Sequence, residues 1–114
     1  MKPIAGDLLR GHVETMVLSV LQRGEGHGLE ILRRLEDAGC GLLRLKEGSL
    51  YPALYRLEAA GLIIARTEKD PAGKRGAPRR VYELTKKGHK ALSQARNEWT
   101  EFVRVVGGIV GATA

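Results

Sequence analysis

The spacing of apolar residues along this chain changes twice, and this pattern restricts the possible order of secondary-structure elements. Up to Gly61 the large apolar residues recur at steps of three and four, as on one face of an α-helix. Between Leu62 and Leu84, two short β-prone runs flank the segment DPAGKRGAP, which is rich in glycine, proline and charge. Helical spacing returns after Thr85. We therefore predict three helices, a β-hairpin and one long helix, in that order.

The first three helices are delimited by capping residues and glycines. Asp7 is a plausible N-cap for the first, and His27 is expected to cap or pack at the start of the second. Pro52 fits only near the start of the third helix, because proline lacks an amide hydrogen and clashes with a preceding turn. Ser49 or a neighbour is its expected cap. The three helices are predicted over residues 7–23, 27–38 and about 48–60.

The segment after the third helix predicts two strands, 62–69 and 79–84, joined by a loop over 70–78. This loop is longer than a two-residue turn, so the hairpin is expected to have a long tip. Positive charge concentrates here: residues 66–80 hold six basic and two acidic residues, in a chain of formal net charge +6.

The last predicted helix, about 86–106, carries apolar residues at alternating steps of three and four. Thr85 is its expected N-cap, and Gly107 and Gly108 are expected to fray its end. This 3.5-residue spacing is typical of a coiled-coil seam rather than of a helix facing a broad core. We therefore expect a second copy of the chain to pack along this seam, which consists of Leu92, Ala95, Trp99, Phe102, Val106 and Ile109.

Two adjacent helices followed by a hairpin form the pattern of a winged helix-turn-helix, whose third helix enters the major groove of DNA. With Leu50, Leu54 and Leu57 facing inward, the outer side of that helix carries small residues and tyrosines. Tyrosine can hydrogen-bond phosphates, and arginine can bind a phosphate or a guanine. Alternatively, the tyrosines occupy an ordinary surface or a helix contact. The candidate DNA-binding residues of this helix are Ser49, Tyr51, Pro52, Tyr55 and Arg56.

The basic hairpin adjoins this predicted recognition helix, so we favour contact between its tip and DNA. A solvated charged loop is the common alternative for such a segment. The candidate wing residues are Lys74, Arg75, Arg79 and Arg80.

Other functional classes find little support in the sequence. A single cysteine, Cys40, cannot form an internal disulfide, and no apolar run is long enough for a signal peptide or a bilayer span. We therefore expect a cytoplasmic protein without membrane contact. Cys40 and the three histidines lack the spacing of a zinc site, so neither a metal nor a cofactor is expected.

Catalysis is not expected either. Glu47, Glu58 and Glu83 are candidate carboxylates, but no nucleophile, phosphate loop or metal motif accompanies them. Glu58 is instead expected to pair with a nearby basic residue, such as Arg33 or Arg34.

Three blocks of sequence resemble the PadR family of bacterial transcriptional regulators. They are HGLEILRRLE (27–36), EGSLYPALYRLEAAGLI (47–63) and RRVYELTKKGHKAL (79–92). The middle block is the most specific, and the resemblance extends over about residues 8–103. The single C-terminal helix is similar to that of the compact PadR subfamily. Leu29, where the family often has an aromatic residue, and Lys46, where many members have a small residue or proline, depart from the family pattern.

The resemblance implies a winged-helix homodimer that represses transcription at a pseudo-palindromic operator. It also implies release by a small aromatic or lipophilic molecule, bound where the last helices cross at the dimer interface. Trp99 matches the family's aromatic position on that helix, so it is expected to anchor the interface, to bind a ligand, or both. The chain has few aromatic residues, so such a pocket would depend on Trp99 and Phe102.

These observations predict a mainly α (α+β) protein: a winged helix-turn-helix with a two-stranded β-wing and a long C-terminal dimerisation helix. Residues 1–84 are expected to bind DNA and residues 85–114 to dimerise, together forming one compact domain. Its first and last helices would set the spacing of two recognition helices. The alternative function is a winged-helix module that binds a partner protein through Tyr51 and Tyr55 without sequence-specific DNA binding.

Overall fold

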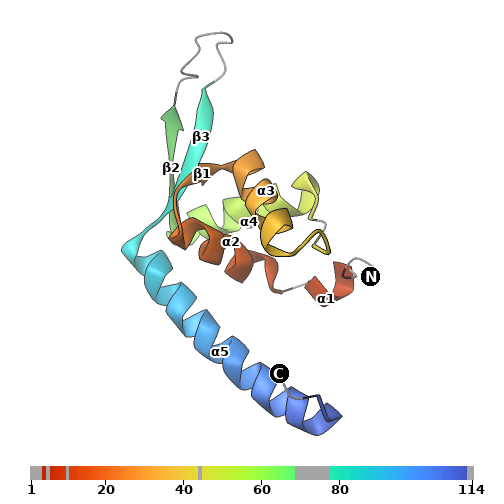
Figure 1. Ribbon diagram of the computed structural model, residues 1–114. Coiled ribbons are helices and arrows are strands. Elements are labelled where there is room, and N and C mark those ends of the chain that lie inside the picture. Colours follow the sequence, from red (N-terminus) through yellow and green to blue (C-terminus); the bar gives the residue numbers. More distant parts are fainter. Residues whose placement is uncertain (1–3, 5, 10, 44, 69–77, 113–114) are drawn as a thin grey trace.

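The computed structural model describes residues 4, 6–9, 11–43, 45–68 and 78–112 (Figure 1). Helices form a body beside a small antiparallel sheet, and one long helix extends away from it. The winged-helix class, mainly helical with a small sheet, is confirmed. The elements in chain order are α1 (Gly6–Leu9), α2 (Val13–Gln22), β1 (Gly26–His27), α3 (Gly28–Ala38), α4 (Glu47–Ala59), β2 (Ile63–Glu68), β3 (Arg79–Leu84) and α5 (Lys86–Val110).

The first predicted helix, 7–23, is two helices in the structure, α1 and α2. Gly11 lies between them with φ of +86°, a left-handed conformation that glycine adopts at little cost. The apolar spacing continues across this break, which is why the sequence indicated one helix. α1 begins at Gly6, so the prediction that Asp7 is the N-cap is wrong.

The N-termini of α3 and α4 are stabilised differently. His27 caps α3: its Nδ1 accepts a hydrogen bond from the Glu30 amide at 3.3 Å, and Glu30 Oε1 accepts one from the His27 amide at 3.0 Å. The predicted capping role of His27 is confirmed. α4 begins at Glu47 without a side-chain cap, so the prediction that Ser49 or a neighbour caps it is wrong. Pro52 lies inside this helix.

The sheet has three strands rather than the predicted two. β3 pairs with β2 in the hairpin and also with β1, which gives the antiparallel order β1-β3-β2. Gly26 of β1 is opposite Tyr82, and His27 is opposite Val81. A strand of two residues is too short to show an alternating pattern, so apolar spacing could not reveal it.

The described hairpin follows the predicted strands closely. β3 covers the predicted 79–84, and β2 begins one residue later than the predicted 62–69. Nearly all of the predicted loop 70–78 lies outside the described residues, and the wing candidates Lys74 and Arg75 lie outside them too.

The hydrophobic core lies between α2, α3, α4 and the sheet. Leu50, Leu54 and Leu57, the predicted inner side of α4, are all buried. They pack with apolar side chains of the other helices, and Leu92 joins them from α5. The opposite side of α4 therefore lies at the surface. The other buried members of this cluster are Val17, Leu18, Leu21, Ile31, Leu35, Leu43, Leu45, Ile63 and Tyr82.

Helix α5 has 25 residues and extends further than predicted. Thr85 is its N-cap, as predicted, because its Oγ1 accepts a hydrogen bond from the Gly88 amide at 3.0 Å. The helix continues through Gly107 and Gly108 and ends before Gly111, which has φ of +79°. The predicted fraying at the glycine pair is wrong.

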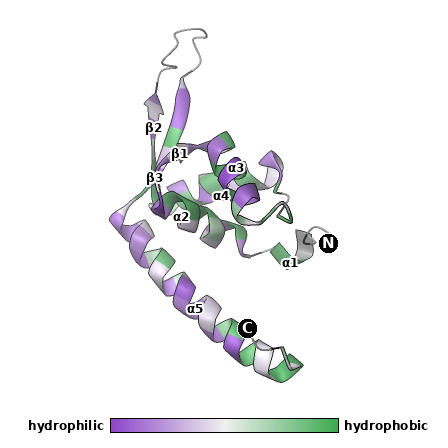
Figure 2. Cartoon of the chain, viewed as in Figure 1, coloured by the Kyte–Doolittle hydropathy of each residue, from purple (hydrophilic) through white to green (hydrophobic). Residues whose placement is uncertain are grey.

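Most of α5 lies away from the body. Gly88 and Leu92 are its buried residues, whereas Trp99 is 50% exposed, Phe102 53% and Ile109 80%. Figure 2 shows apolar residues gathered at the far end of this helix. One copy of the chain thus leaves much of the predicted seam uncovered.

The start of α5 lies tightly against the segment that follows α4. The Thr85 amide donates a hydrogen bond to the Leu62 carbonyl at 3.1 Å, and Thr85 Oγ1 donates one to the Gly61 carbonyl at 2.7 Å. A Cβ added at Gly88 would lie 2.0 Å from the Leu62 carbonyl oxygen. Only glycine allows this approach, which determines the direction in which α5 leaves the body.

We predict that Gly88→Ala destabilises the protein by about 1–3 kcal/mol, as overpacking does elsewhere. Gly108→Ala is the matched control, because a Cβ at Gly108 meets nothing within 4 Å. Because Gly108 lies within α5, Gly108→Ala should raise the free energy of unfolding by up to about 1 kcal/mol. Urea unfolding followed by circular dichroism measures both, and equal stability of the two variants would contradict the tight contact.

Candidate nucleic-acid interface

The outer side of α4 and strand β3 border a shared hollow of about 510 Å³. Tyr51 and Tyr55 line it from α4, and Arg80 lines it from β3, so the structure brings three predicted site residues together. Tyr55 is 75% exposed, and Tyr51 is 43% exposed. The other lining residues are Glu58, Ala59 and Tyr82.

The remaining predicted residues of α4 lie elsewhere on the helix. Ser49, Pro52 and Arg56 line a groove of about 610 Å³ between α4 and the start of α2. Arg56 Nε donates a hydrogen bond to Glu14 Oε1 of α2 at 3.0 Å. Arg79 is exposed on β3, where strand alternation places it on the opposite face from Arg80.

Arg80 is held across the hollow by residues of both elements. Its Nη2 donates hydrogen bonds to Glu58 Oε1 at 3.1 Å and to Oε2 at 2.8 Å, and its guanidinium carbon lies 5.9 Å from the centre of the Tyr82 ring. The Tyr82 side chain, together with the Glu58 carboxylate, raises the pKa of Arg80 above its ordinary value. Arg80 therefore links α4 to strand β3.

Glu58 pairs with a basic residue, as predicted, but the partner is Arg80 rather than the suggested Arg33 or Arg34. Arg34 instead donates hydrogen bonds to the carbonyls of Gly24 and Glu25, both at 2.9 Å. The sequence could not indicate this, because the path of β3 across α4 decides which arginine lies near Glu58.

Tyr51 combines exposure with a tight internal contact. Its hydroxyl lies against the first residue of α3, where a Cβ at Gly28 would be 2.5 Å from the oxygen. Burial raises the pKa of the Tyr51 hydroxyl, and the nearby Glu47 carboxylate raises it further. Tyr51 thus has the predicted helix contact as well as a surface position, whereas Tyr55 projects into solvent.

The wing strand β2 is tied to the body by another ion pair. Arg66 Nη2 bonds the carboxylate of Glu25 and also lies 3.2 Å from Glu68 Oε2. The hydrogen bond from Arg66 lowers the pKa of Glu25 below its usual value. Arg56, Arg66 and Arg80 are therefore each paired with a carboxylate in this structure.

Two residues of this surface were not predicted from the sequence. Tyr82 lies within the block RRVYELTKKGHKAL, where no pattern marks it as a site residue, and Glu14 lies on a helix distinguished only by its apolar stripe. Both act through contacts with arginines: Tyr82 with Arg80 on the same strand, and Glu14 with Arg56 of α4. The charges in the sequence indicate that such contacts can form, but they do not specify which residues pair.

The seam residues border a separate hollow of about 620 Å³ between α5 and the α1–α2 segment. Trp99 and Phe102 stack there with ring centres 5.8 Å apart, and the His12 ring meets Trp99 edge-on at 5.1 Å. Leu92 and Ala95 also line this hollow. Val106, the remaining residue predicted for this site, lies further along α5 and is 38% exposed.

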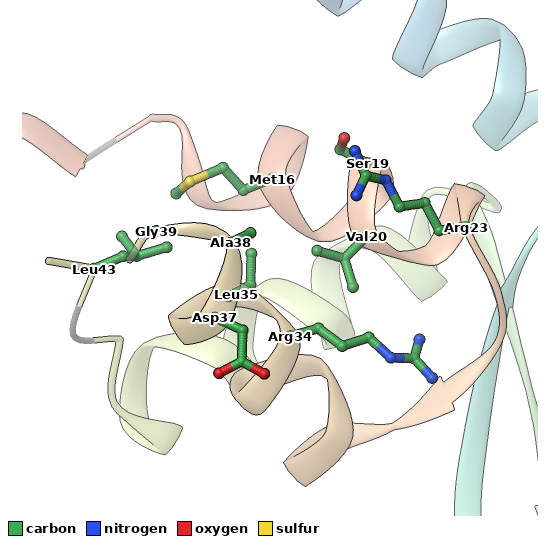
Figure 3. A pocket seen from close by; sticks show the side chains of 10 residues that line it. All are labelled: Met16, Ser19, Val20, Arg23, Arg34, Leu35, Asp37, Ala38, Gly39 and Leu43. Atoms are coloured by element: carbon green, nitrogen blue, oxygen red, sulfur yellow. The ribbon is translucent and has the colours of Figure 1, made fainter. Parts of the chain in front are cut away.

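A further groove, of about 760 Å³, lies between α2 and α3 and contains none of the predicted site residues. Figure 3 shows Met16 and Val20 of α2 opposite Leu35 of α3, with Arg23 and Arg34 at one end. Its lining is largely apolar with a charged rim.

Within the described ranges, no group of three or more His, Cys, Asp or Glu residues could hold a metal ion. No helix in the part of the chain that the structure describes has both the length and the apolar character to cross a membrane.

Comparison with known proteins places these features in a family. The model of the transcriptional regulator PadR-like family matches residues 17–94. A transcriptional regulator of Mycobacterium tuberculosis is 35% identical over 100 residues, which are 87% of this chain and 87% of that protein.

Solved structures agree with this result. A transcriptional regulator from Clostridium thermocellum is 32% identical with a TM-score of 0.83, over 94% of this chain and 98% of that one. A PadR family regulator from Eggerthella lenta is 28% identical with a TM-score of 0.79, over 91% of this chain and 86% of that one. This chain therefore belongs to the PadR-like family of transcriptional regulators, which bind DNA and are not enzymes.

Proposed function

We propose that this regulator is a homodimeric repressor that binds a pseudo-palindromic operator and is released by a small aromatic or lipophilic ligand. The observation that carries the DNA-binding part is the hollow shared by α4 and β3, where Tyr51, Tyr55 and Arg80 meet. A recognition helix and a wing that border one surface can contact a groove and the adjacent phosphates together.

Dimerisation is supported by the exposed apolar side of α5. Large apolar side chains exposed together on one helix usually mark an interface, because leaving them in water is unfavourable. In our proposal residues 1–84 bind DNA, and residues 85–114 pair with the same segment of a second copy. The exposed large apolar residues of α5 are Trp99, Phe102, Val105, Val106, Ile109 and Val110.

Ligand release is supported by the hollow beside Trp99. Its volume, about 620 Å³, is within the usual range for small-molecule sites, and the stacked rings of Trp99 and Phe102 offer flat apolar surfaces. Because the hollow lies between α2 and α5, a ligand there would act on the angle between the two copies. The spacing of the two recognition helices, about 34 Å for adjacent half-sites, would change with that angle. Affinity falls only as far as the ligand prefers the released state.

The decisive experiment measures binding of the purified full chain to its own upstream DNA and to a random duplex, over a salt series. We predict a dimeric complex with the upstream DNA that is about 10³-fold tighter than with the random duplex. We also predict that affinity falls steeply as salt rises, since phosphate contacts release counterions. Weak, equal and salt-insensitive binding to both duplexes would favour the protein-binding alternative.

We predict that replacing Arg75, Arg79 and Arg80 by alanine weakens binding across all sequences, because these residues are proposed to contact phosphates. The salt slope should flatten by about one for each phosphate that the variant no longer neutralises. A triple variant of Lys86, Lys90 and Arg104 to alanine is the control, because it removes the same charge from exposed positions on α5. Equal slopes for the two triple variants would exclude the wing from the DNA interface.

We predict that Trp99→Ala reduces binding of the aromatic probe anilinonaphthalene sulfonate by about tenfold, as expected when a central tryptophan is truncated. Trp99→Phe, which keeps an aromatic ring, should retain most of the binding. Probe fluorescence measures affinity, and sedimentation velocity reports the dimer separately. Unchanged probe binding by a dimeric Trp99→Ala would remove Trp99 from the ligand site and leave it, at most, as an interface anchor.

A further inference from the structure

Glu58 places a negative charge in the middle of the surface proposed to face DNA. It lines the same hollow as Tyr51 and Tyr55, and both of its carboxylate oxygens accept hydrogen bonds from Arg80. A DNA phosphate that reached Arg80 would therefore meet a carboxylate already bound to it. Only Nη2 of the guanidinium donates to Glu58, so a phosphate could still accept from Nε and Nη1, but the adjacent carboxylate would repel it and would keep Nη2 from it.

The pair is exposed enough to exchange partners. The Arg80 side chain is 55% exposed and that of Glu58 is 37% exposed. Exposed ion pairs contribute little to folding stability because water screens them. The guanidinium carbon of Arg80 lies 5.9 Å from the centre of the Tyr82 ring. Arg80 therefore keeps this contact when its hydrogen bonds to Glu58 break. Tyr82 thus helps to hold Arg80 in place, while Glu58 neutralises its charge and occupies its Nη2.

We propose that Glu58 is a specificity-determining residue that limits non-specific DNA binding. In the free protein it holds Arg80 through Nη2, and DNA gains the full charge and all the hydrogen-bond donors of the arginine only by displacing the carboxylate. A random duplex, bound through phosphates alone, loses most from this competition, whereas an operator adds base contacts that compensate for it. This inference rests on the proposed function, since it needs α4 and β3 to face DNA.

The test compares wild type with Glu58→Gln on a random 30-base-pair duplex at several salt concentrations. Glutamine keeps the size of the side chain and removes the charge that competes with phosphate. We expect the affinity for the random duplex to rise about two- to fivefold, the range expected when an exposed ion pair is removed. The salt slope should steepen by about one, because Arg80 gains a phosphate. The preference for upstream over random DNA should fall.

Glu36→Gln is the charge-matched control, because Glu36 is exposed on α3 and does not line the hollow. It reports how much any loss of one negative charge raises DNA affinity. An equal effect from Glu36→Gln and Glu58→Gln would overturn the proposal. Far-ultraviolet circular dichroism of each variant confirms that the fold is retained.

A double-mutant cycle with Arg80→Ala separates release of Arg80 from simple repulsion. If Glu58 acts by holding Arg80, Glu58→Gln in the Arg80→Ala background should change affinity no more than Glu36→Gln does. If Glu58→Gln has the same large effect with and without Arg80, the carboxylate merely repels DNA and the proposal is wrong. Weaker binding by Glu58→Gln to both duplexes would also overturn it, since Glu58 would then only position Arg80.

Failure of this inference is distinguishable from failure of the proposed function. Wild-type protein that binds neither duplex would refute the proposed function, and this inference with it. Wild-type protein that binds in a salt-dependent manner, together with an unchanged Glu58→Gln, would refute this inference alone.

Discussion

Burial of Leu50, Leu54 and Leu57 on one side of α4 is the constraint on which the rest of this structure depends. Three leucines at helical spacing must leave water together, and α2, α3 and the sheet supply the surfaces that cover them. Once that side is inward, Tyr55 on the opposite side has to project into solvent. The same burial brings β3 beside α4, because Tyr82 of β3 belongs to the same cluster. The hollow between helix and wing is a consequence of core packing.

The electrostatics of this surface are less simple than its basic composition suggests. Arg56, Arg66 and Arg80 each lie against a carboxylate from a different segment of the chain. Such pairs contribute little to folding stability. They do neutralise positive charge that would otherwise attract DNA. A regulator must leave non-specific DNA in order to find its operator, so weak intramolecular competition for arginines is compatible with function. In the function that we propose, positive charge on the wing attracts DNA, and the paired carboxylates moderate that attraction.

Helix α5 connects this surface to the seam. Its direction is determined at its first turn, where Gly88 lies against the Leu62 carbonyl and Thr85 bonds the chain leaving α4. Because these contacts join α5 to the end of α4, a change in the angle of α5 would act directly on α4, the proposed recognition helix. Trp99 lies about three turns further along, where α5 borders α2. The proposed ligand site and the proposed DNA surface are thus linked by one continuous helix.

The sequence by itself determined the order of the elements, the buried side of α4, the caps at His27 and Thr85, and the exposed position of Tyr55. These features follow from local spacing and from side chains bonding to their own backbone, which a linear sequence displays. Tertiary structure alone decided that β1 joins the sheet, that Glu58 pairs with Arg80 rather than with Arg33 or Arg34, and that Tyr51 packs on Gly28. Each of these joins residues from separate elements, whose meeting depends on how the elements pack. The break at Gly11 and the continuation of α5 through Gly107 and Gly108 show the same limit, because a glycine permits a turn or a helix and its surroundings decide which.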